Sequence, residues 1–186
     1  LHPLKYALGL AKAARSLGAE LYEHSCVTGY RTGVDQKVHV STPAGEVRSR
    51  YLVLACNGYL GGLEDRIAGN IMPINNFMVA TEPLPEDLAL QINRDNVSLS
   101  DSLFVINYWK LSADRRLLFG GGENYSSRFP KDIKAFVRPY MLKLYPDLAD
   151  TTISHGWGGT LGITLNRMPD FGRLDTHTFY AHGFSG

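Results

Sequence analysis

The residues best suited to chemistry gather late in the chain, between His155 and Gly186. This stretch combines a glycine cluster, a tryptophan, the run Arg-Met-Pro-Asp at residues 167–170 and the final sequence HGFSG. A backbone rich in glycine can come close to a flat or charged partner, because no side chain intervenes. Glycines also form ordinary turns and bulges, so this feature alone leaves a ligand site and plain packing open.

Two other kinds of catalytic site fit the sequence poorly. The six histidines are scattered, and none is spaced from another His, Cys or carboxylate as a metal-binding pair would be, so we expect no metal. A serine hydrolase could combine Ser185 with His182 and Asp170. Its nucleophile turn, however, needs a glycine two residues on each side of the serine, whereas Gly186 follows Ser185 directly.

The composition is that of a globular protein of 186 residues. Lys and Arg number 19 against 18 Asp and Glu, and this net charge of +1 gives no reason to expect a nucleic acid or an acidic membrane as partner. The chain lacks an apolar run of about 20 residues and a secretory signal, so we expect a cytoplasmic protein without a membrane span. Apolar neighbours of Cys26 and Cys56 predict two buried, reduced thiols.

The first 70 residues predict one helix followed by strands. Apolar residues at helical spacing predict a helix over residues 3–17, closed by Gly18. A short strand is expected at 20–23, and alternating residues predict an antiparallel meander at 27–31, 37–41 and 46–50. Residues 51–56 are typical of a strand buried on both faces that ends at Asn57-Gly58, and such strand ends bind ligands in α/β sheets.

From Ile71 onward the pattern predicts a second, mainly antiparallel sheet. Strands are expected at residues 75–84, 97–99, 104–111, 116–121, 151–165 and 178–181. Apolar side chains at helical spacing after Pro130, stopped by Pro146, predict a helix over residues 131–144 that covers one face of this sheet. The expected fold class is therefore α+β, a mixed α/β arrangement.

A nucleotide cofactor would use several of these features together. The strand end at residues 55–58, the Trp-Gly-Gly at 157–159 and a final strand that enters a glycine-started helix could surround a long cofactor. The fingerprint G-x-G-x-x-G after a first strand is absent from the sequence. From the residues alone, a nucleotide site and a packing explanation stay equally open.

Seven motifs in order resemble the FAD-dependent amine and D-amino-acid oxidase family, which includes glycine and sarcosine oxidases. They are HP at residues 2–3, YLVLACNG at 51–58, ATEPL at 80–84, LLFGGG at 117–122, WGGT at 157–160, RMP at 167–169 and HGFSG at 182–186. The phrases LSADRRLLFGGGENYSSRFPKDI and WGGTLGITLNRMPDFGRL resemble the gamma-glutamylputrescine oxidoreductases within that family.

The resemblance implies an enzyme that oxidises the CH–NH group of an amine, such as gamma-glutamylputrescine, to an imine and then an aldehyde. Residues 1–70 would be part of an FAD-binding domain, 71–155 a substrate domain, and 156–186 a return to the first domain. The chain would be an inactive fragment, because the fingerprint would precede it and a helix would follow HGFSG. Catalytic residues and oligomeric state stay unknown.

The same likeness implies how the cofactor is held and leaves the electron acceptor open. FAD would be bound non-covalently, since residues 156–171 contain no cysteine. Residues 116–122 contain no lysine, which related sarcosine oxidases use to activate oxygen, so oxygen as the acceptor stays open. The residues expected to contact FAD are Val27, Ala55, Asn57, Gly58, Trp157, Gly158, Met168, Pro169, Gly183, Phe184, Ser185 and Gly186.

For the substrate we expect an aromatic wall and a cation. Phe77, Tyr108 and Trp109 would exclude water and favour a neutral amine. Lys110 or Arg167 would bind the carboxylate of a gamma-glutamyl tail, although either could equally be a solvated surface charge. A folded binding module without flavin, whose glycines only form turns, is the alternative from another class.

Overall fold

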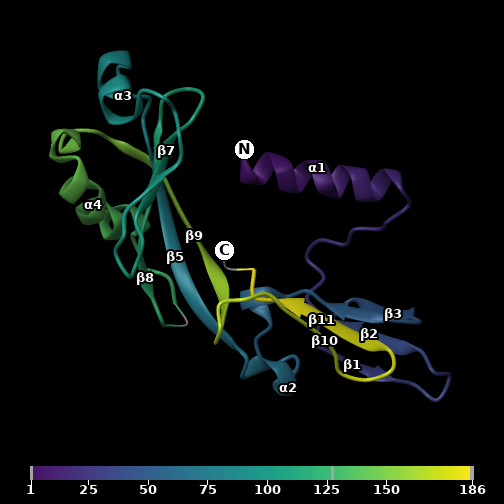
Figure 1. Ribbon diagram of the computed structural model, residues 1–186. Coiled ribbons are helices and arrows are strands. Elements are labelled where there is room, and N and C mark those ends of the chain that lie inside the picture. The colour runs from purple at the N-terminus through teal and green to yellow at the C-terminus, as the bar shows by residue number, and fades with distance from the viewer. Residues whose placement is uncertain (1, 127, 185–186) are drawn as a thin grey trace. The chain divides into compact units, whose positions relative to one another are not determined.

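The computed structural model describes residues 2–126 and 128–184, which form two compact units (Figure 1). Unit 1 comprises residues 1–52 and 175–178, and unit 2 comprises residues 53–174 and 179–186. The fold is mixed α/β with antiparallel sheets, as predicted. In the described part of the chain, no helix is both long and apolar enough to span a membrane.

Unit 1 begins with helix α1 (Pro3–Ser16), which confirms the predicted helix. His2 caps its start, since the Nδ1 atom accepts a hydrogen bond of 3.3 Å from the Lys5 amide, and Pro3 occupies the first turn, where no backbone donor is needed. The helix ends at Leu17, and Gly18 follows with a φ of +92°.

The predicted meander is present as a three-stranded antiparallel sheet in unit 1. It contains β1 (Gly29–Thr32), β2 (Val38–Thr42) and β3 (Gly45–Ser49), in that order. The buried ring of His39 lies between two carboxylates, with Nε2 3.2 Å from Asp35 Oδ1 and Nδ1 2.9 Å from Glu46 Oε1. The hydrogen bond with His39 holds the pKa of Asp35 below its usual value.

Three predictions for this part of the chain were wrong. Residues 20–23 form no strand, because no described segment pairs with them. Cys26 is exposed and Cys56 is half-buried, although both thiols are free as expected. The strand predicted over residues 51–56 is the short β4 (Leu52–Leu54), the edge strand of a sheet in the order β10-β11-β4. It is buried on one face only, since Leu54 is 4% exposed and Val53, on the other face, is 60% exposed.

Unit 2 contains the predicted second antiparallel sheet, with five strands in the order β6-β7-β8-β5-β9. Its strands are β5 (Ile71–Thr81), β6 (Leu99–Ser100), β7 (Tyr108–Leu111), β8 (Leu117–Asn124) and β9 (Ile153–Thr164). The chain then forms the hairpin of β10 (Asp170–Arg173) and β11 (Thr178–His182). The sequence predicted β11 but missed β10. The strand predicted over residues 104–111 was wrong in its first half, because residues 104–107 belong to a loop and only β7 is a strand.

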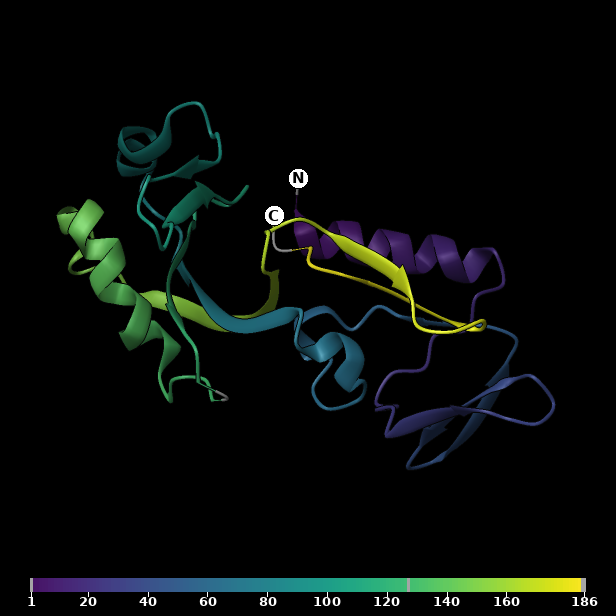
Figure 2. The same cartoon turned by 60° about the horizontal axis from the view of Figure 1, so that its bottom comes forward.

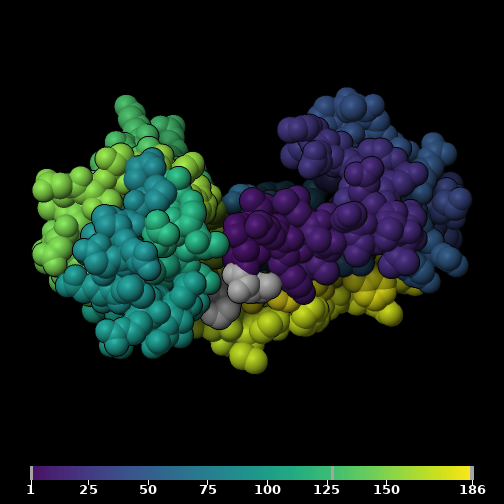
Figure 3. Space-filling view, turned by 90° about the horizontal axis from the view of Figure 1, so that it is seen from above, coloured from purple at the N-terminus to yellow at the C-terminus, as the bar shows by residue number. Residues whose placement is uncertain are grey.

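Helix α4 (Ile133–Leu144) confirms the helix predicted to cover this sheet, and it packs along β5, β8 and β9 (Figures 1 and 2). Asp132 caps it by accepting a 3.0 Å hydrogen bond from the Ala135 amide. Its buried Val137 and Met141 meet Phe77 and Phe119 of the sheet in one apolar core. In the space-filling view, these teal and green segments form one continuous mass (Figure 3).

Short helices of unit 2 escaped the sequence analysis, because so few residues give no clear period. They are α2 (Asp65–Ala68), α3 (Glu86–Asn93) and the 3₁₀ turns η1 (Asn57–Tyr59) and η2 (Pro146–Leu148).

A bulge in β8 lets α4 come close to the sheet. The register between β5 and β8 shifts between Asn76 and Met78, and Gly122 adopts a φ of +74° there. A Cβ atom at Gly122 would lie 2.6 Å from Phe136 Cε1 and 2.9 Å from Tyr140 Cε2. Glycine is required at this position by both its backbone conformation and the nearby helix.

We therefore expect Gly122→Ala to lower the thermal unfolding midpoint of the protein, by a loss of about 1–3 kcal/mol from backbone strain and steric overlap. Gly69→Ala is the matched control, since Gly69 has an ordinary φ and no atom within 4 Å of its added Cβ. Equal midpoints for Gly122→Ala and Gly69→Ala would show that the bulge tolerates a side chain.

Candidate functional site

Several residues expected to contact a cofactor meet around Asn57 in unit 2. The backbone N–H of Gly183 donates a 2.9 Å hydrogen bond to Asn57 Oδ1, which joins the end of β11 to the η1 turn. Gly58 presses against β9, because an added Cβ would lie 2.6 Å from the Thr160 carbonyl oxygen. The hydroxyl of Tyr59 accepts a 2.9 Å hydrogen bond from the Thr160 amide. We call this arrangement of Asn57, Gly58, Thr160 and Gly183 the Asn57 corner.

The turn after β9 closes on the same corner. The Thr164 hydroxyl donates a 2.7 Å hydrogen bond to the Met168 carbonyl, and Asn166 Oδ1 accepts one of 3.0 Å from the Met168 amide. Gly183 has a φ of +81°, and an added Cβ would lie 2.5 Å from Thr164 Cγ2. The Arg-Met-Pro turn and the start of HGFSG are therefore fixed against each other.

Three of the cofactor candidates in unit 2 expose large apolar side chains. Trp157, Met168 and Phe184 are 43%, 61% and 53% exposed, and the ring of Phe184 packs edge-on against Phe171 with centroids 5.7 Å apart. Ala55 and Pro169 are also exposed.

The remaining cofactor candidates lie elsewhere. Val27 is half-buried in unit 1, ahead of β1. Gly158 is on β9, where an added Cβ would lie 2.7 Å from the Phe77 ring, so its lack of a side chain already serves internal packing. Ser185 and Gly186 lie outside the described residues.

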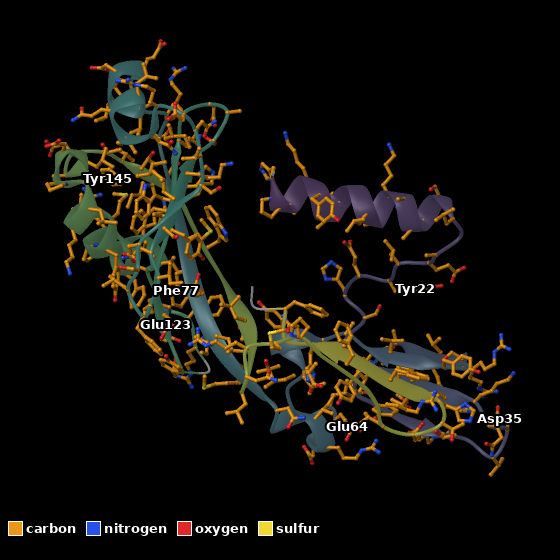
Figure 4. The ribbon with its side chains drawn as sticks, viewed as in Figure 1. Tyr22, Asp35, Glu64, Phe77, Glu123 and Tyr145 are labelled. Carbon is orange, nitrogen blue, oxygen red and sulfur yellow. The ribbon has the colours of Figure 1, made fainter. Side chains whose placement is uncertain are left out.

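The substrate candidates divide between the two faces of the five-stranded sheet. Phe77 and Trp109 face α4: Phe77 is fully buried between Phe129 and Phe136, at centroid distances of 5.4 and 5.1 Å (Figure 4). Trp109 stacks on Phe119 at 5.9 Å. Because successive residues of a strand point to opposite faces, Tyr108 and Lys110 lie on the other side, which we call the open face. A role of Phe77 or Trp109 at a substrate stays a prediction.

The open face carries a row of residues that crosses four strands. The register pairs Tyr108 with Gly120, Gly120 with Met78, and Met78 with Trp157. The ring of Tyr108 lies over Gly120, because a Cβ at Gly120 would be 2.4 Å from its carbon atoms. We call these four residues the Tyr108–Trp157 row. A substrate candidate and a cofactor candidate therefore share one row.

Tyr108 is oriented by a residue that the sequence analysis missed. Its hydroxyl donates a hydrogen bond to Asn76 Oδ1, and Asn76 Nδ2 donates one of 3.3 Å to the Gly122 carbonyl. Burial raises the pKa of Tyr108, so the phenol is protonated at neutral pH. Only the alternation of β5 could have placed Asn76 on the open face, and a strand-interior asparagine gives no other signal.

Arg167 combines an unusual backbone conformation with a contact to another loop. Its φ is +60°, and its guanidinium carbon lies 5.7 Å from the centroid of the Phe104 ring. No carboxylate within residues 2–126 and 128–184 forms an ion pair with Arg167 or Lys110. Both cations are therefore available to an anionic ligand, and Phe104 was not among the residues that the sequence pointed to.

Two of the three hydrolase candidates, His182 and Asp170, lie among the described residues, and Ser185 does not. His182 Nε2 lies 2.8 Å from Asp170 Oδ2 across the β10–β11 pair, and His182 is only 2% exposed. A ring this buried has no access to a substrate. The described residues contain no group of three or more His, Cys, Asp or Glu side chains that could hold a metal.

The unit 2 residues suit one part of an FAD molecule. A flat, largely apolar ring system is the kind of group that exposed side chains such as Trp157, Met168 and Phe184 could contact. A pyrophosphate needs a glycine-rich turn between a strand and a helix, and the described residues provide none. Contact of these residues with the ring end of FAD stays a prediction.

The chain was also compared with known proteins. A family model described as "DAO: FAD dependent oxidoreductase" matches residues 1–186. The chain is 40% identical over 187 residues to gamma-glutamylputrescine oxidoreductase of Escherichia coli (strain K12), covering 100% of this chain and 43% of that protein. It is 38% identical over 192 residues to a probable oxidoreductase OrdL of Haemophilus influenzae, with the same coverages of 100% and 43%. The chain therefore spans less than half the length of these relatives.

Solved structures share the fold. The L-proline dehydrogenase of P. horikoshii matches with a TM-score of 0.75 and 23% identity, over 99% of this chain and 50% of that one. The glycine oxidase of Geobacillus kaustophilus matches with a TM-score of 0.74 and 23% identity, over 95% of this chain and 47% of that one. Together with the family match over all 186 residues, these findings show that the chain belongs to the DAO family of FAD-dependent oxidoreductases.

Proposed function

We propose that this chain is part of an enzyme that oxidises the CH–NH group of an amine of the gamma-glutamylputrescine type. The Tyr108–Trp157 row carries the proposal, because it puts an oriented phenol and an exposed indole on one face of the sheet, opposite the face that α4 covers. The E. coli relative, at 40% identity, is named for gamma-glutamylputrescine, which supports the choice of substrate.

The cofactor supplies the redox step: when bound, FAD accepts a hydride from the carbon that bears the amine. The residues of this chain prepare the amine for that step. The Tyr108 hydroxyl donates its proton in a hydrogen bond to Asn76 Oδ1. Its oxygen can therefore accept a hydrogen bond from the amine nitrogen. Tyr108 is partly buried, and desolvation of an amine beside it would favour the neutral amine that a hydride transfer requires.

The cations Lys110 and Arg167 suit the other end of such a substrate. Lys110 lies in the neighbouring row of the open face, which pairs Lys110 with Leu118, Leu118 with Ala80, and Ala80 with His155. Arg167 offers the fork of N–H donors that binds a carboxylate in two places. We assign the gamma-glutamyl carboxylate to Arg167, because its backbone is held in a conformation that costs energy and that commonly marks a functional residue.

The proposed function also assigns parts of the chain to two domains. Residues 1–70 and 156–186 would belong to the FAD-binding domain and residues 71–155 to the substrate domain, with the phosphate-binding part of FAD held by other residues of the protein. The 186 residues alone would then retain little flavin and be inactive. A cytoplasmic location agrees with these small, polar substrates and stays a prediction.

The whole protein, expressed with its complete coding sequence, tests the function directly. Purified protein should carry the visible absorbance of an oxidised flavin, and anaerobic gamma-glutamylputrescine should bleach it while an aldehyde forms. Flavin that no amine reduces would contradict the proposal. A complete protein that never binds flavin would favour the alternative of a binding module.

Replacing Arg167 tests the carboxylate assignment. In the complete enzyme, Arg167→Ala should raise KM for gamma-glutamylputrescine by roughly tenfold to a hundredfold, because a charge-assisted pair with the tail is lost. KM for putrescine, which has no carboxylate, should change by less than about twofold. Arg94→Ala, which removes an exposed cation at the end of α3, is the matched control and should leave both KM values unchanged. Equal effects of Arg167→Ala on both substrates would contradict the assignment.

Replacing Trp157 tests the cofactor side of the Tyr108–Trp157 row. Trp157→Ala should weaken flavin retention or shift the flavin absorbance, because an exposed aromatic surface beside the ring is removed. Trp157→Phe keeps an aromatic ring and should retain most of the flavin. An unchanged spectrum and unchanged occupancy in Trp157→Ala would rule out contact between this side chain and the cofactor.

A further inference from the structure

Residues 101–107 form a loop that one carboxylate holds closed. Asp101 Oδ1 accepts hydrogen bonds from the amides of Leu103 (3.2 Å) and Asn107 (3.0 Å), and Asp101 Oδ2 accepts one of 2.6 Å from Asn107 Nδ2. The Asp101 amide in turn donates to the Asn107 carbonyl at 3.0 Å. The loop therefore has a fixed base directly before β7, whose first residue is Tyr108.

The fixed loop presents apolar side chains to solvent. Leu103, Phe104 and Ile106 are 52%, 83% and 48% exposed. Exposing a phenylalanine almost completely forgoes the free energy of burying it, about 1.5–3 kcal/mol for a side chain of this size. A loop built this way is suited to covering an apolar part of a ligand.

Phe104 also contacts the turn that carries Arg167. The guanidinium carbon lies over the Phe104 ring, 5.7 Å from its centroid. This contact joins the connection after β9, at one edge of the sheet, to the connection before β7, near the other edge. The ring attracts the cation without neutralising it, so the N–H donors at the edge of the guanidinium stay available for a carboxylate.

We propose that Phe104 is a specificity-determining residue that selects amines with a distant carboxylate. Its ring orients the Arg167 guanidinium toward that carboxylate and covers the methylene chain between the carboxylate and the amine. The inference rests on the proposed amine oxidation and adds to it the residue that discriminates among amines. Plain diamines, which offer no carboxylate to Arg167, gain nothing from the contact.

Variants of the complete enzyme separate the ring from the rest of the side chain. Phe104→Leu keeps an apolar group but loses the attraction to the cation, so the KM for gamma-glutamylputrescine relative to that for putrescine should rise roughly threefold to tenfold. Phe104→Tyr keeps the ring and should stay within about twofold of the parent. Leu90→Ala, which removes an exposed apolar side chain from α3, should leave the ratio unchanged. An unchanged ratio in Phe104→Leu would overturn the proposal.

A double-mutant cycle tests whether Phe104 acts through Arg167. If it does, Phe104→Leu should alter the KM ratio in the parent enzyme and add little in the Arg167→Ala background. Fully additive effects of the two substitutions would overturn the proposal, because they would show that the ring acts independently of the guanidinium.

Binding without turnover separates this inference from the proposed reaction. The probe is 5-(butylamino)-5-oxopentanoate, which keeps a carboxylate, an amide and an alkyl chain but has no amine to oxidise. Calorimetric titration should show weaker binding to Phe104→Leu than to the parent or to Leu90→Ala. Equal binding to the three proteins, or none to the parent, would overturn the assignment of Phe104. Failure of every amine to reduce the flavin would instead contradict the proposed function.

Discussion

The pairing of β5 on both of its edges is the constraint on which unit 2 depends. Ile71–Thr81 bonds to β8 on one side and to β9 on the other, so the face on which each side chain lies is fixed across three strands at once. A shift of one residue would move Phe77 and Val79 out of the core and Asn76 and Met78 into it. The bulge at Gly122 absorbs the one irregularity in this pairing and still lets α4 seal the apolar face.

Sequence patterns predicted the elements that have a clear period. The helices at α1 and α4 and the long strands of both antiparallel sheets were expected, because amphipathic repeats reflect burial against a neighbour. Sequence patterns failed where the structure of a segment depends on its pairing or packing partner. Residues 20–23 pair with nothing described, and in β4 only the face that carries Leu54 is buried, so Val53 on the other face is exposed. Helix α3 and β10 are short, and their periods are too weak to read.

For the candidate site, the motifs indicated which stretches of sequence contribute, but not on which face of the sheet each side chain lies. Resemblance identified Asn57, Gly58 and Gly183 as neighbours of one ligand, and the structure joins them by a hydrogen bond and close backbone packing. Contact of these three residues with FAD stays a prediction. The hydrogen bond between Tyr108 and Asn76, and the contact of Phe104 with Arg167, join segments between 32 and 63 residues apart, and no local pattern encodes such a pair.

The glycine-rich strand β9 shows why motif residues must be sorted by geometry before chemistry is assigned to them. Gly158 makes room for the Phe77 ring and Gly162 for the Asn57 side chain, so both glycines are explained by contacts within the protein. Directly before Gly158, the strand turns Trp157 to the open face, opposite Met78. A family motif constrains residues that pack and residues that bind alike. In β9 the two kinds alternate, because successive residues of a strand lie on opposite faces of the sheet. Packing on the face toward α4 therefore fixes the position of Trp157 on the open face.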